Sequence, residues 1–115
     1  MLLDRMSKTG KRHAPGSMIA SQIKVLAGGV TGVHLKHERA WASITFSGIR
    51  YGFSIEWPDT AKATAVLELA RLLPDHEFAI PGYFVADIVI TEQSDLRLLV
   101  EILCIVDPVD DLRGC

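Results

Sequence analysis

Residues 40–57 read AWASITFSGIRYGFSIEW, and they carry the clearest structural pattern in the chain. Apolar and polar residues alternate on both sides of Ser47-Gly48, with the period of two that a half-buried β-strand requires. A serine–glycine pair between two such segments predicts a two-residue hairpin turn, which would set Arg39 across from Glu56 as a cross-strand ion pair. We therefore expect an antiparallel hairpin with one apolar face.

Beyond this hairpin the sequence predicts a helix followed by further strands. Pro58-Asp59-Thr60 interrupts the strand, and Asp59 or Thr60 supplies a helix cap. The apolar residues that follow have helical spacing and form one stripe: Ala63, Val66, Leu67, Ala70 and Leu73. Pro81-Gly82 predicts a turn before a strand over residues 83–91. Residues 96–106 fit either a helix or a strand, and their β-branched residues favour the strand.

The register of the second hairpin depends on Asp87. Burying an unpaired carboxylate costs several kcal/mol, roughly, so we expect an odd loop of residues 93–95, or a β-bulge, to turn Asp87 outward. This choice also turns a set of apolar residues away from the helix, where Trp41 joins them. The set consists of Val85, Val89, Leu99, Leu103 and Ile105.

These segments predict a single α+β domain in the order β-β-α-β-β, an antiparallel sheet of two hairpins with one helix between them. We assign residues 17–109 to this domain, residues 1–16 to a flexible basic leader and residues 110–115 to a C-terminal tail. Residues 18–33 fit a short helix or a strand. If residues 96–106 were helical, the order would become β-β-α-β-α.

Composition excludes several classes of protein. The chain has 115 residues, a formal net charge of −2 and 49% hydrophobic residues, which is typical of one folded domain and excludes global disorder. The near-neutral charge argues against a dedicated nucleic-acid-binding protein. Nucleic acid could be contacted only through the leader, by its basic residues Arg5, Lys8, Lys11 and Arg12.

The same composition argues for a cytoplasmic protein. No apolar run is long enough for a membrane helix, and the first residues lack the pattern of a secretory signal. Cys104 and Cys115 are isolated in sequence, which is typical of reduced thiols. We interpret Cys104 as a buried core residue rather than a nucleophile.

Few residues suggest chemistry. His34 and His37 are three apart, and on a strand we expect them to point to opposite sides, so we predict no metal site and no cofactor. Asp87 lies between apolar residues and is a candidate general acid or base, whose partner would have to be Glu101, Arg97 or His76. A carboxylate satisfied by Arg97 is the structural alternative.

The sequence thus favours a non-enzymatic interaction module that forms a homodimer through an apolar sheet face. We expect this interface, or a ligand site in its place, to involve Trp41, Val85, Val89, Arg97, Leu99 and Leu103. The alternative is a small-ligand-binding protein or minor enzyme with a cleft around Asp87 and Glu101.

Overall fold

The computed structural model describes residues 15–28 and 32–108; the leader before residue 15 and the tail lie outside this part of the chain. The α+β class is confirmed, but the order of elements is α-β-β-α-β-β, because a helix precedes the first strand. The elements are α2 (Pro15–Leu26), β2 (Gly32–Ala42), β3 (Ser47–Glu56), α3 (Ala63–Leu72), the 3₁₀ turn η1 (Leu73–Asp75), β4 (Tyr83–Gln93) and β5 (Arg97–Val106).

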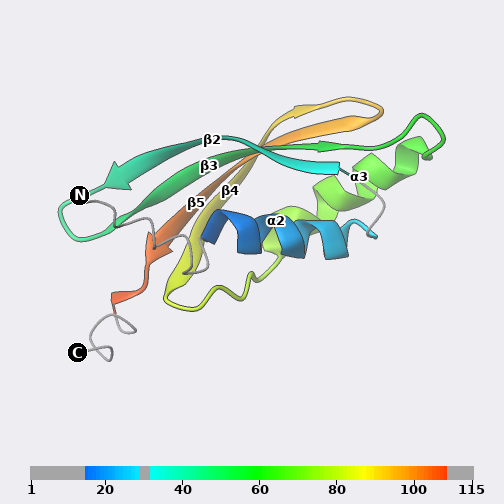
Figure 1. The fold of residues 1–115 in the computed structure, drawn as a ribbon. Coiled ribbons are helices and arrows are strands. Elements are labelled where there is room, and N and C mark those ends of the chain that lie inside the picture. Colours follow the sequence, from blue (N-terminus) through cyan, green and yellow to red (C-terminus); the bar gives the residue numbers. More distant parts are fainter. Residues whose placement is uncertain (1–14, 29–31, 109–115) are drawn as a thin grey trace, which may run out of the picture.

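The four strands form one antiparallel sheet in the order β2-β3-β5-β4. Of the ambiguous residues 96–106, Arg97–Val106 therefore form a strand, as their β-branched residues favoured. Both helices lie on the same side of the sheet (Figure 1). We call this helix-covered side the inner face and the opposite side the outer face. None of the described helices covers the outer face.

The core lies between the helices and the inner face. Its sheet residues alternate along the two central strands, and its helix residues recur at helical spacing. The fully buried core side chains are Ile19, Ile23, Tyr51, Phe53, Ile55, Leu69, Leu73, Leu98, Val66, Val100, Ile102 and Cys104. Trp57 is also buried, at 6% exposure, as its place in the alternation predicted.

Two details of the helices differ from expectation. Pro15 and Gly16, which we placed in the leader, form the buried first turn of α2, where proline has no amide to leave unpaired. In α3 the buried stripe runs through Leu69, while Leu67 is 57% exposed. The N-cap of α3 is Lys62, which makes no side-chain capping bond, so neither Asp59 nor Thr60 caps this helix.

The first hairpin has a different register from the one predicted. Its turn is at residues 43–46, where the Phe46 amide donates to Ser43 Oγ at 3.0 Å and the Ser43 amide to the Phe46 carbonyl at 2.7 Å. Arg39 consequently pairs with Arg50 and not with Glu56. Gly48 lies inside β3, where a Cβ atom would overlap the Cys104 carbonyl oxygen. This glycine permits the close approach of two strands rather than a turn.

The second hairpin turns Asp87 outward by a β-bulge, which was one of the two expected alternatives, and not by an odd loop; the bulge responsible is the one between Ile90 and Glu92. Register shifts occur between Val85 and Asp87 and between Ile90 and Glu92, and each adds one unpaired residue to β4. The first shift places Val85 opposite Cys104 on the inner face, where it packs against the core. Our placement of Val85 on the outer face was therefore wrong, and Phe84 lies on that face in its stead.

The fold repeats itself. An α-β-β half, α2–β2–β3, is followed by a second, α3–β4–β5, and β5 begins at Arg97, 50 residues after β3 begins at Ser47. Gly52 pairs with Glu101 in the middle of the seam between β3 and β5. A rotation of 180° about an axis perpendicular to the sheet at this pair superposes Phe53 of β3 on Ile102 of β5. Both are core residues. The two halves therefore contribute equivalent inner faces to one core.

A tie between α2 and the segment before β4 closes this core. The side-chain amide of Gln22 donates to the Ala79 carbonyl at 2.7 Å and accepts from the Ala79 amide at 2.9 Å. The chain then turns at Gly82, whose φ of 85° suits a type II turn after Pro81. The Tyr83 amide donates to the Ile80 carbonyl at 3.0 Å across this predicted turn.

Candidate functional site

The outer face is best described in rows that run across the four strands. One row joins Trp41, Gly48, Ile105 and Phe84. The next joins Arg39, Arg50, Leu103 and Asp87. The third joins His37, Gly52, Glu101 and Val89, and the fourth joins His34, Ser54, Leu99 and Glu92. One end of the face is thus apolar and the other is polar.

The apolar end is an aromatic patch, which we define as Trp41, Phe46, Phe84 and Ile105. The rings of Phe46 and Phe84 meet edge to face, with centroids 6.3 Å apart. Phe46 lies in the turn before β3 and Phe84 lies in β4. Ile105 of β5 is only 5% exposed. Phe46 and Phe84 themselves are 36% and 38% exposed. The patch therefore protects its aliphatic centre and presents two aromatic edges to solvent.

The polar end contains a hollow of about 280 Å³, which we call the polar hollow. Its floor includes Gly52, Ser54 and Leu99 from the two central strands. Two of the residues that line it, Lys36 and Thr91, are the extra residues of β-bulges in β2 and β4. Bulges turn side chains out of the regular alternation, so the irregular parts of both edge strands border this hollow.

A histidine–glutamate pair spans the third row. His37 Nε2 lies 3.7 Å from Glu101 Oε2, although their strands are separated by β3. Gly52 makes this contact possible, because a Cβ atom at that position would overlap the His37 ring. The imidazole therefore lies across a backbone that has no side chain, between two strands that do not pair with each other.

The bulge at Lys36 also corrects our prediction for the two histidines. His34 pairs with Ser54 and His37 with Gly52, so both lie on the outer face and not on opposite sides. They are in different rows, and no third ligand joins them. Within residues 15–28 and 32–108, no group of three or more His, Cys, Asp or Glu side chains is arranged to hold a metal ion.

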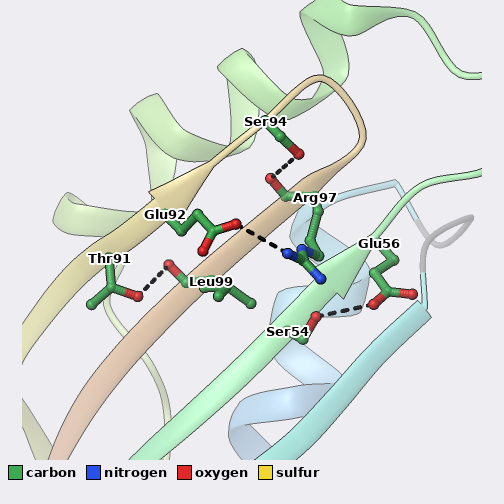
Figure 2. Close-up of polar contacts among 7 residues, drawn as sticks. All are labelled: Ser54, Glu56, Thr91, Glu92, Ser94, Arg97 and Leu99. Carbon is green, nitrogen blue, oxygen red and sulfur yellow. Dashed lines mark hydrogen bonds and ion pairs between the residues drawn. The ribbon is translucent and has the colours of Figure 1, made fainter.

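Hydrogen bonds orient the remaining polar side chains around the hollow (Figure 2). Ser54 Oγ donates to Glu56 Oε2 at 3.2 Å, and Arg97 Nη2 lies 3.0 Å from Glu92 Oε2. Thr91 Oγ1 donates to the Leu99 carbonyl at 3.3 Å, which fixes the bulged strand to β5. The Arg97 side chain therefore contacts Glu92, not the Asp87 carboxylate that we had considered.

The structure separates the two carboxylates proposed as acid and base. Asp87 and Glu101 both lie on the outer face, in neighbouring rows. Glu101 lines the polar hollow, whereas Asp87 lines a separate depression at the edge of β4, beside Pro74 and His76. In the described part of the chain the two carboxylates therefore line different depressions.

The other predicted site residues divide between the two ends of the face. Arg97 and Leu99 line the polar hollow. Leu103 lies in the second row at 7% exposure, so it adds little apolar surface. Sequence reasoning missed His37, Gly52, Ser54 and Glu56 as residues of the hollow. Gly52 within an alternating strand was the available signal, because such a glycine marks a close approach.

Two titratable groups lie on the inner face, away from the hollow. Burial raises the pKa of the Tyr51 phenol to about 12, with smaller contributions from Cys104 and Glu38. Burial also raises the pKa of the Cys104 thiol to about 11. A protonated, buried thiol is a poor nucleophile, which agrees with the prediction that Cys104 is a core residue.

Comparison of the chain with protein-family models, with curated proteins and with solved structures finds no match. No helix in the described part of the chain has the length and hydrophobicity needed to cross a membrane. Function must therefore be argued from the outer face itself.

Proposed function

We propose that this protein is a non-enzymatic interaction module that pairs with a second copy of itself through the outer face of its sheet. The observation that carries this proposal is the second row of that face. Arg39 at one edge and Asp87 at the other edge have opposite charges and are both exposed. An edge-to-edge charge difference of this kind is self-complementary under a two-fold axis.

The direction of the axis follows from the rows. An axis parallel to the strands, between β3 and β5, lays β2 of one copy over β4 of the other and keeps each row opposite itself. Arg39 then faces Asp87 of the second copy in two symmetry-related contacts, and Trp41 faces Phe84 of the second copy in the same way. The charged pairs are one row from the aromatic contacts, so charge complementarity and apolar contact lie side by side at this end of the face.

The other face-to-face arrangement is less favourable. An axis parallel to the sheet, perpendicular to the strands and passing through the third row would lay each strand over its own copy. Asp87 would then approach Glu92 of the second copy, and Trp41 would face Gly32. Like charges in an interface cost several kcal/mol, roughly, so the rows favour the first arrangement.

Charge-exchange variants test the pairing directly. Arg39→Asp places two carboxylates together at both contacts, and Asp87→Arg places two guanidinium groups together. We expect each variant alone to raise the dissociation constant by about 100-fold or more. An equimolar mixture of the two variants should form a heterodimer, because each contact then joins opposite charges again. Light scattering coupled to size-exclusion chromatography measures the mass of all three samples.

Matched controls make the same charge changes away from the outer face. Lys24→Asp on α2 and Asp59→Arg in the loop before α3 affect exposed residues and should leave the dimer mass unchanged. A monomeric wild-type protein at micromolar concentration would contradict the proposal. So would a mixture of Arg39→Asp and Asp87→Arg that stays monomeric.

A further inference from the structure

Both acidic and basic side chains line the polar hollow. Lys36 and Arg97 contribute positive charges, Glu56 and Glu101 contribute negative charges, and the His37 ring lies beside Glu101. The fixed charges therefore cancel. A simple anion would meet two carboxylates here, and a simple cation would meet a lysine and an arginine.

Two hydrogen bonds bring charged groups toward the row of Ser54 and Leu99. Ser54 Oγ holds Glu56 Oε2 at 3.2 Å, so the carboxylate of Glu56 turns back along β3. Glu92, which pairs with Leu99, holds the Arg97 guanidinium at 3.0 Å. Figure 2 shows the Glu56 carboxylate and the Arg97 guanidinium on the same side of the sheet as Ser54. Opposite charges are thus fixed around one apolar floor residue, Leu99.

Two groups of the hollow retain binding capacity. Lys36, the extra residue of the β2 bulge, makes no ion pair with any other residue in the described ranges. Glu56 Oε2 accepts from Ser54, while its second oxygen has no donor among these residues. An ammonium group and a carboxylate oxygen that border the same hollow are together suited to a ligand with both charges.

We propose that the polar hollow binds a small zwitterion of the α-amino-acid type. The ligand carboxylate contacts the Lys36 ammonium group, and the ligand ammonium group contacts the free oxygen of Glu56. The ligand side chain lies over Leu99. A hollow of about 280 Å³ is at the small end of ligand pockets, which restricts the ligand to a few non-hydrogen atoms beyond its charged groups.

Titration calorimetry of the full chain tests this with L-alanine and with two analogues that each lack one of its charged groups. Propionate has the carboxylate without the amine, and ethylamine has the amine without the carboxylate. We expect saturable binding of L-alanine and at least about tenfold weaker binding of propionate or ethylamine, because each analogue lacks one charge-assisted hydrogen bond. No saturable binding of L-alanine, or equal binding of propionate or ethylamine, would overturn the proposal.

Two variants locate the binding in the hollow. Lys36→Met and Glu56→Gln should each weaken L-alanine binding by about tenfold or more. Both positions are exposed, so the melting temperature should stay close to that of the wild type. Lys24→Met on α2 is the matched control and should bind normally. Unchanged affinity in both hollow variants would place the ligand elsewhere and refute the assignment.

The hollow uses no residue of the Arg39–Asp87 contact or of the aromatic patch. Its rows nevertheless lie on the face that the proposed pairing covers, so the Arg39→Asp variant is titrated with L-alanine beside the wild type. L-alanine binding with a monomeric wild-type chain would refute only the pairing. A wild-type dimer whose monomeric Arg39→Asp variant binds no L-alanine would refute only the hollow.

Discussion

The two α-β-β halves of this protein have the same inner face and different outer faces. Tyr51 and Phe53 of β3 correspond to Val100 and Ile102 of β5, and all four are buried. On the outer side, Gly52 of β3 corresponds to Glu101 of β5. The inner positions must fill one core, so packing fixes their character. The outer positions have no such constraint, and the differences between the halves are concentrated there.

If the halves share one core, equivalent inner residues should matter about equally. We expect Phe53→Ala to lower the free energy of unfolding by about 3–5 kcal/mol and Ile102→Ala by about 2–5 kcal/mol. Urea denaturation measures both. A loss below about 1 kcal/mol for one of them would show that its half packs loosely and that the equivalence is only topological.

The glycines of β3 should differ from each other although neither has a glycine counterpart in β5. Gly48→Ala places a methyl group on the Cys104 carbonyl, and we expect a loss of about 1–3 kcal/mol. In Gly52→Ala the three nearest atoms to the new methyl group all belong to the His37 ring, which can rotate toward solvent. Removing glycine from a strand also favours folding, so we expect a change within about 0.5 kcal/mol. Equal losses for both variants would contradict this reading of Gly52.

Each half contributes one buried acid whose pKa is raised, Tyr51 to about 12 and Cys104 to about 11. In the unfolded chain the pKa values of these two groups are nearer their ordinary values of 10.0 and 9.0. The free energy of unfolding should therefore fall as the pH rises through 9–11 for Cys104 and through 10–12 for Tyr51. The slope is at most about 1.4 kcal/mol per pH unit for each group.

Urea titrations between pH 8 and pH 12 measure this slope, and Tyr51→Phe removes the phenol while retaining most of the ring packing. This variant should lose the upper part of the slope and keep the part that Cys104 causes. An unchanged slope in Tyr51→Phe would exclude the phenol as a source of the alkaline loss.

Much of the fold could be predicted from alternation and helical spacing. The alternation in residues 49–57, the strand at 96–106 and the outward Asp87 were all predicted from patterns that burial imposes. The predicted order of elements was incomplete because residues 18–33 fit either a helix or a strand. The three bulges left no compositional signal, and each bulge reverses the face on which subsequent residues lie.

The candidate site shows the same limit. Arg97, Leu99 and Glu101 were predicted on the outer face, and they line the hollow. We expected His37 to lie on the opposite side of the sheet from His34. The bulge at Lys36 instead places both histidines on the outer face. Val85 and Phe84 exchanged faces for the same reason. Bulges thus border the hollow and also account for the residues that sequence reasoning misplaced.

The seam between β3 and β5 has a consequence for how the chain folds. Within each half the two strands of the hairpin are joined by a short turn, so they can form from local contacts alone. The seam instead joins residues as distant in sequence as Gly48 and Ile105, and it is the step that carries most of the loop-closure entropy. We therefore expect the two hairpins to nucleate separately, and the backbone fit at Gly48 to form when they dock.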